Sequence, residues 1–226
     1  MKGTLVNTGA VIIGSLLGLA IGSKFTQKIN SIVMHGLGLA TILIGIKMAI
    51  QTQSVLLIIG SLVLGGITGE LLRIEDGIEW LGNFIKSKIK SDSANFTLGF
   101  VTASLVFCVG PMTVIGSIQD GISGNASVLY AKSILDGFAS LVFASTLGLG
   151  VLFSALTVLI IQGGLTLLGN SLTFLLQPVA LNELIATGGL IIVGIGLYLL
   201  DIKKIRVANL LPALVFAVVL ALIFKH

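Results

Sequence analysis

Charged residues and cysteine are both scarce in this chain, and each shortage excludes a class of protein. Charged residues make up 10% of the 226 positions while 55% are hydrophobic, more apolar surface than a water-soluble domain of this length can bury. The single cysteine, Cys108, cannot form an internal disulfide or a cysteine metal site. The two histidines, His35 and His226, lack zinc-ligand spacing, so no metal or other cofactor is expected.

Long uncharged runs stand where a soluble protein would have a mixed sequence. Residues 137–182 carry no charge, and this run is more than twice the roughly 20 residues that one bilayer crossing needs. The apolar runs are continuous and do not alternate with polar residues, which favours helices because a helix satisfies its own backbone groups in lipid. The sequence therefore predicts an all-α, polytopic transmembrane helical bundle, organised as a single integral membrane domain over residues 1–226.

About eight spans are predicted, and the join between the fifth and sixth is marked only by Gly148 and Gly150. The spans cover residues 5–21, 31–50, 54–69, 96–118, 128–149, 151–168, 184–200 and 207–224. With the N-terminus outside, most of the 13 Lys and Arg residues fall in cytoplasmic loops. The chain is therefore expected in the inner (cytoplasmic) membrane as a multi-pass protein, in contact with the lipid bilayer and with both termini outside.

Residues 70–92 form a different kind of segment. Apolar residues recur every three or four positions from Leu71 to Ile89, and charged residues fill the other face. Trp80 and the lysines that follow it suit an amphipathic helix on the cytoplasmic membrane surface, although a small soluble subdomain has the same pattern. Glu70 and Arg73, at the start of this segment, are predicted to form an interfacial pair, and the alternative is that Glu70 gates the inner side.

A weak internal repeat relates the two ends of the chain. Spans one to three and six to eight share one order of helices and loops, and residues 38–45 resemble residues 189–194. Five crossings separate the copies, so the two copies would lie upside down relative to each other, as in many secondary transporters. The alternative is that any two glycine-rich apolar helices look alike.

The fourth predicted span contains Gly110 and Pro111. Proline removes a backbone donor and clashes with the preceding turn, so a kink or break is expected there. In the fifth span, Asp136 lies at a depth where a charge needs partners inside the bundle. Lys132, one turn away, offers the simplest partner, a structural pair that neutralises itself.

The alternative to a structural pair is an outward vestibule in which Asp136 and Lys132 join Asp120 and Gln119. This vestibule would lead to the Gly110–Pro111 break, whose freed carbonyls could bind a cation. Gln162 is expected near the membrane midplane, where an amide needs a partner. Six hydroxyl residues are candidates for the rest of the lining, although each alone is typical of helix packing: Ser104, Thr113, Ser117, Ser140, Ser145 and Ser154.

Several of these stretches resemble a known family. They are Phe-Cys-Val-Gly at 107–110, Gly-Ser-Ile-Gln-Asp-Gly at 116–121, Lys-Ser-Ile-Leu-Asp-Gly at 132–137, Gly-Val-Leu-Phe-Ser-Ala at 150–155 and Leu-Leu-Pro-Ala at 210–213. The chain is similar over essentially its whole length to the bacterial membrane proteins grouped as domain-of-unknown-function family 554. The resemblance implies a multi-pass inner-membrane protein and says little about mechanism.

The favoured function is a small secondary transporter or ion permease, with a small solute or ion as its ligand. A non-transporting membrane scaffold or regulator is the alternative. An enzyme is not expected because the sequence shows no nucleophile and base together. Nucleic acid is excluded as a partner by the small number of basic residues, and a second copy of the chain is a further candidate partner.

Overall fold

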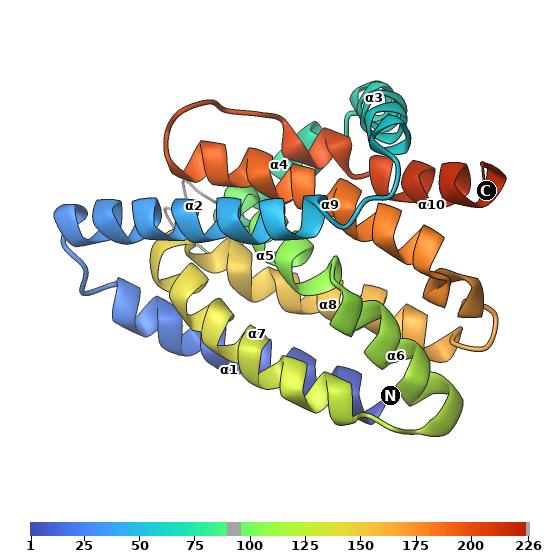
Figure 1. Cartoon of the computed structure of the whole chain (residues 1–226). Helices are drawn as coiled ribbons and strands as arrows, with labels where there is room; N and C mark the ends of the chain where they lie inside the picture. The colour runs from blue at the N-terminus through green and yellow to red at the C-terminus, as the bar shows by residue number, and fades with distance from the viewer. Residues whose placement is uncertain (90–95, 225–226) are drawn as a thin grey trace. The chain divides into compact units, whose positions relative to one another are not determined.

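The computed structural model describes residues 1–89 and 96–224, and every regular element in these two ranges is a helix (Figure 1). The helices are α1 (Lys2–Gly22), α2 (Gln27–Ala49), α3 (Val55–Leu72), α4 (Ile74–Ile89), α5 (Phe96–Cys108), α6 (Pro111–Ser123), α7 (Ser127–Leu147), α8 (Leu149–Leu167), η1 (Thr173–Leu176), α9 (Pro178–Leu199), η2 (Val207–Leu210) and α10 (Ala213–Ile223). The predicted all-α fold class is confirmed. Residues 90–92 of the predicted amphipathic segment lie outside the described residues.

The helices long and apolar enough to cross a membrane match most of the predicted spans. Six qualify singly, namely α1, α2, α3, α7, α8 and α9, and the bent pair α5–α6 brings the number to seven if it forms one span. The stretch Val207–Ile223 is apolar but shorter. A multi-pass helical membrane protein is therefore supported, while the count of eight and the orientation stay predictions.

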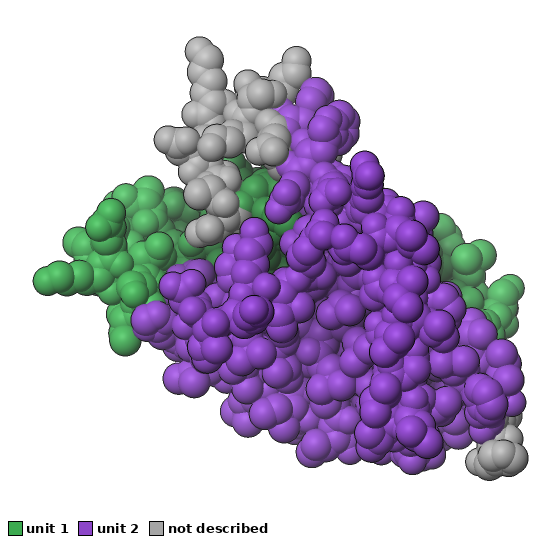
Figure 2. Space-filling model, turned by 90° about the horizontal axis from the view of Figure 1, so that it is seen from above, with its two compact units in different colours: residues 1–33, 91–176 green, residues 34–90, 177–226 purple. Residues whose placement is uncertain are grey.

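The chain folds into two compact units, each made of two separate segments (Figure 2). Unit 1 comprises Met1–Val33 and Ser91–Leu176 and holds α1, α5, α6, α7 and α8. Unit 2 comprises Met34–Lys90 and Gln177–His226 and holds α3, α4, α9, η2, α10 and the greater part of α2. The expectation of one integral membrane domain over residues 1–226 stays a prediction.

In unit 1, α1 and α7 lie against each other along their whole length and run parallel. A Cβ added to Gly14 would collide with the carbonyl oxygen of Gly137, and one added to Gly18 would collide with that of Leu141. Only glycine permits this approach of one backbone to another, which is how helices gain packing energy in lipid. The close packing predicted from the glycine content is present here, and it brings the polar side chains of α1 to the face of α7.

In unit 2, α2 and α9 cross at two glycine pairs. A Cβ on Gly45 would lie 2.6 Å from the oxygen of Gly189, and one on Gly196 would lie 3.0 Å from the oxygen of Gly38. In each helix the two glycines are seven residues apart, so exchanging the helices exchanges the two contacts. The repeat predicted from the sequence made Gly194 the equivalent of Gly45. A twofold exchange of α2 and α9 instead makes Gly196 the equivalent of Gly45, and Gly194 faces Ile205 and Val207.

The other predicted counterparts also pack antiparallel. In unit 1, Thr4 and Asn7 of α1 contact Thr166 and Gln162 of α8, respectively. In unit 2, α3 meets η2 and α10, with Gly60 beside Leu220 and Gly69 beside Asn209. An inverted repeat about an axis in the membrane plane gives antiparallel counterparts of this kind. Superposition of the two copies stays a prediction.

Candidate functional site

Two charged side chains lie buried in the first half of α7. Lys132 is 5% exposed and Asp136 is 7% exposed, and the ammonium of Lys132 forms an ion pair with Oδ2 of Asp136. The two residues are one helical turn apart, so the helix itself brings them together. Asp136 lies about 13 Å from the start of α7, given a rise of 1.5 Å per residue. A charge at such a depth in a spanning helix needs further partners.

Those partners come from α1 and α8. Asn7, which is fully buried, donates from Nδ2 to Oδ2 of Asp136 and to Oε1 of Gln162, both at 2.9 Å. The Nε2 of Gln162 lies 3.4 Å from the hydroxyl of Thr4, and that hydroxyl lies 3.2 Å from the hydroxyl of Thr166. We call this set the polar cluster, and its members are Thr4, Asn7, Lys132, Asp136, Gln162 and Thr166.

Three of the predicted site residues therefore come together, namely Lys132, Asp136 and Gln162. Asn7 and Thr4 were missed, although the depth argument applied to Gln162 applies equally to an amide in the first span. The polar cluster is held by three apolar helices of unit 1, and two of its members carry opposite charges. It has the composition of an ion or polar-solute site and lacks a nucleophile paired with a base.

Asp120 and Gln119, at the end of α6, take different positions. Asp120 is 5% exposed, and its Oδ2 accepts the backbone N–H of Gly3 at 3.2 Å and lies 2.9 Å from the nitrogen of Met1. It thus occupies the N-terminal end of α1, where a carboxylate is favoured by free N–H groups and by the helix dipole. Gln119 is exposed and lies outside the polar cluster.

The predicted break in the fourth span is confirmed. Helices α5 and α6 are bent by 58°, with Gly110 extended before α6 and Pro111 in its first turn. Proline suits that position because its missing N–H would be unpaired there in any case. One carbonyl at the break, that of Phe107, accepts the hydroxyl of Thr113 at 2.9 Å. Cation binding by the other freed carbonyls stays a prediction.

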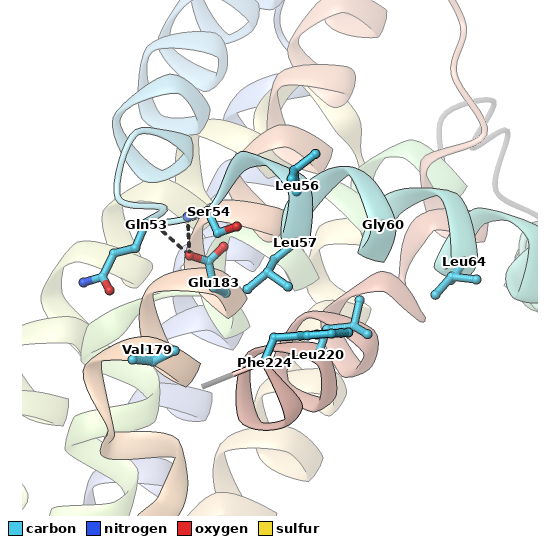
Figure 3. A pocket seen from close by; sticks show the side chains of 10 residues that line it. All are labelled: Gln53, Ser54, Leu56, Leu57, Gly60, Leu64, Val179, Glu183, Leu220 and Phe224. Carbon is cyan, nitrogen blue, oxygen red and sulfur yellow. Dashed lines mark hydrogen bonds between the residues drawn. The ribbon is translucent and has the colours of Figure 1, made fainter. Parts of the chain in front are cut away.

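Unit 2 contains a second buried carboxylate, Glu183 on α9, beside a cavity of about 650 Å³ (Figure 3). Glu183 is 1% exposed and accepts hydrogen bonds from the hydroxyl of Thr52 at 2.7 Å, the N–H of Gln53 at 2.8 Å and the N–H of Ser54 at 3.2 Å. The walls of the cavity are otherwise mainly apolar: Leu56, Leu57, Leu64, Val179, Leu220 and Phe224. The seventh span was predicted to begin at residue 184, whereas α9 begins at Pro178, so the sequence analysis left Glu183 in a loop.

The structure gives Glu70 partners other than the predicted Arg73, and a gating role for the two residues stays a prediction. The carboxylate of Glu70 accepts Arg206 at 2.6 Å and the amide of Asn209 at 2.7 Å. Arg73 instead ends α3 in the left-handed conformation, with φ 51°, and this geometry turns the chain into α4. Glu70 pairs with Arg206 because η2, which Arg206 directly precedes, packs along the end of α3.

Glu75, in the first turn of α4, belongs to the same contact. Its carboxylate accepts the N–H of Ala208 at 3.1 Å, and its own N–H donates to Oδ1 of Asn209 at 2.8 Å. Burial raises the pKa of the Glu75 carboxyl, and the hydrogen bond from Ala208 offsets this rise only in part. These hydrogen bonds attach the amphipathic helix α4 to η2 within unit 2.

Known proteins resemble this chain over nearly its whole length. Residues 2–222 match the family model described as "Protein of unknown function (DUF554)". The chain is 32% identical over 218 residues to the uncharacterized membrane protein YdfK of Bacillus subtilis (strain 168), covering 95% of this chain and 93% of that protein. It is 30% identical over 224 residues to the uncharacterized protein YqgA of Escherichia coli (strain K12), covering 97% and 95%, respectively. No solved structure matches. The resemblance noted in the sequence is thereby confirmed, and the chain belongs to the DUF554 family of multi-pass membrane proteins.

Proposed function

We propose that this protein is a small secondary transporter or ion permease of the cytoplasmic membrane and that the polar cluster is its transport site. The observation that carries the proposal is the buried Lys132–Asp136 pair, held by side chains from α1 and α8. A charge at the centre of a spanning helix costs about 2.5–3.5 kcal/mol even on lenient insertion scales. Such residues in membrane proteins most often mark a substrate or ion pathway.

The helix packing supports the same function. Alternating access needs a site beside elements that can change their tilt, and inverted repeats provide two equivalent arrangements. In this chain α1 packs antiparallel to α8, and both contribute to the polar cluster. The two helices that would exchange roles in such a movement therefore both contact the site.

The test separates a structural ion pair from a transport site. Asp136→Asn leaves Lys132 buried without its counter-ion, so the protein should lose stability by about 3–5 kcal/mol. The double variant Asp136→Asn/Lys132→Met removes both charges and should recover most of that stability. We expect membrane abundance to return in the double variant while flux in proteoliposomes stays lost.

Flux is measured as the current and pH change that follow concentration jumps of sodium, lithium, potassium and a panel of small organic solutes. Thr157→Val is the matched control, because it removes a hydrogen bond between α5 and α8 in the same unit but outside the polar cluster. Flux at the wild-type level in the double variant would show that the pair is structural. Wild-type protein that moves no more ion or solute than protein-free vesicles would favour a membrane scaffold.

A further inference from the structure

One acceptor of the polar cluster has no hydrogen-bond partner. The Oδ1 atom of Asn7 is buried, and none of the residues that the structure describes donates to it. The orientation of the Asn7 amide follows from its surroundings, since its Nδ2 donates to two oxygens, those of Asp136 and Gln162. The free atom at the site is therefore an oxygen, and a buried oxygen without a donor is an unfilled ligand position.

The other members of the polar cluster also provide oxygen ligands of the kind that bind hard cations. They are the carboxylate of Asp136, the amide oxygen of Gln162 and the hydroxyls of Thr4 and Thr166. Carboxylate, amide and hydroxyl oxygens suit alkali and alkaline-earth ions and have little affinity for softer metals.

The charge of the polar cluster selects a univalent ion. Asp136 is its only carboxylate, and the ammonium of Lys132 neutralises it. A divalent ion usually takes several carboxylates, and the described residues contain no group of three acidic, histidine or cysteine side chains that could hold one. One univalent cation in place of the ammonium leaves the net charge next to Asp136 unchanged.

The ammonium of Lys132 can reach the membrane surface when it leaves Asp136. It lies five residues after the start of α7, about 8 Å along the helix axis. Its four-carbon stem is flexible, and lysines near helix ends extend their ammonium to the membrane surface while the stem stays in apolar surroundings. Asp136, one turn deeper on a short side chain, stays in place.

We infer that the polar cluster binds an alkali-metal cation in exchange for the ammonium of Lys132, with Asp136 and Oδ1 of Asn7 as ligands. The inference rests on the proposed function and names the class of ion that the site takes. Lys132 thereby holds the empty site closed and competes with the ion for one carboxylate. This competition distinguishes the arrangement from a structural pair, in which Lys132 would only stabilise the fold.

The experiment measures cation binding to the purified full chain in detergent, without transport. Cys108 is the chain's only cysteine and is buried, so a thiol-reactive fluorophore reports the melting temperature. Sodium or lithium chloride is titrated against N-methyl-D-glucamine chloride at constant ionic strength. We expect a rise of about 5 °C when the ion reaches roughly 100 times its half-saturating concentration, and a further rise with the logarithm of the ion concentration, from which the half-saturating concentration is fitted.

Two substitutions of Lys132 should shift the half-saturating concentration in opposite directions. Lys132→Met removes the competitor and should lower this concentration by about 10-fold or more. Lys132→Arg places a permanently charged guanidinium beside Asp136 and should raise it. Asn7→Leu removes the free oxygen and should raise it by about 10-fold. Thr157→Val should leave it unchanged.

A melting temperature that stays unchanged when sodium or lithium replaces N-methyl-D-glucamine overturns the inference, whatever the variants do. The inference also fails if Lys132→Met and Lys132→Arg leave the half-saturating concentration at the wild-type value, because competition requires opposite shifts. If Lys132→Met folds only in sodium, the ion replaces the missing ammonium, as expected. Cation binding without flux would refute the transport proposal alone, and flux of a neutral solute without cation binding would refute this inference alone.

Discussion

Asp136 in unit 1 and Glu183 in unit 2 are both carboxylates buried among apolar helices, yet their partners differ in kind. Asp136 is held by two side chains, the ammonium of Lys132 and the amide of Asn7, and a neighbouring oxygen is left free. Glu183 is held by the hydroxyl of Thr52 and by two backbone N–H groups just before α3. Side chains can change partners, whereas backbone groups at a helix start stay where they are. This difference makes Asp136, and not Glu183, the carboxylate that we propose for transport.

Replacing Glu183 by Ala should give a large loss of stability, comparable to that of Asp136→Asn. It removes the charged acceptor from one hydroxyl and two N–H groups at the start of α3, so three hydrogen bonds are lost. The expected cost is about 3 kcal/mol or more, measured as the melting temperature in detergent. Flux per folded molecule should stay at the wild-type level, and a selective loss of flux would place Glu183 in a second site.

Asn7→Ala should have an intermediate effect on stability and a strong effect on flux. The substitution removes two hydrogen bonds and leaves oxygens of Asp136 and Gln162 with fewer donors, at a cost of about 2 kcal/mol. Because Asn7 also provides the free oxygen, flux in proteoliposomes should fall with it. Full flux in a destabilised variant would show that Asn7 only supports the packing of α1.

Glu183→Gln is the more conservative test of the second carboxylate. The amide oxygen of glutamine still accepts the N–H groups of Gln53 and Ser54, so only the charge is lost. We expect a loss of about 1 kcal/mol from the weaker helix-dipole interaction and weaker hydrogen bonds, with normal flux. The same change at Asp136, to Asn, should abolish flux, and similar flux in the two variants would remove the distinction between the units.

The smallest effect concerns Glu75 and pH. Its raised pKa means that the folded state binds more protons than the unfolded state between the usual pKa of glutamate and the raised value. The stability contributed by protonated Glu75 is therefore present at low pH and is lost as the pH rises through this window. In Glu75→Gln this part of the pH dependence should be absent, and a wild-type pH profile in that variant would contradict the assignment.

The sequence predicted the features that are determined within a single segment of the chain. Hydropathy located the spans, a four-residue spacing paired Lys132 with Asp136, and Pro111 marked the break before α6. Contacts between helices could not be predicted, because the sequence does not say which faces meet. Asn7 reaches Asp136 across 129 positions, and Arg206 reaches Glu70 across 136, at the expense of the neighbouring Arg73.

The crossing of α2 and α9 also limits how the two halves of the chain can diverge. Gly45 and Gly189 share one contact, and Gly38 and Gly196 share the other, so neither helix can gain a side chain there unless the partner yields. A mutation that enlarges one of these positions would separate the helices at both contacts, because they lie only two turns apart. The four glycines should therefore persist together among descendants of this chain, and a lineage that replaces one of them should carry a compensating change on the opposite helix.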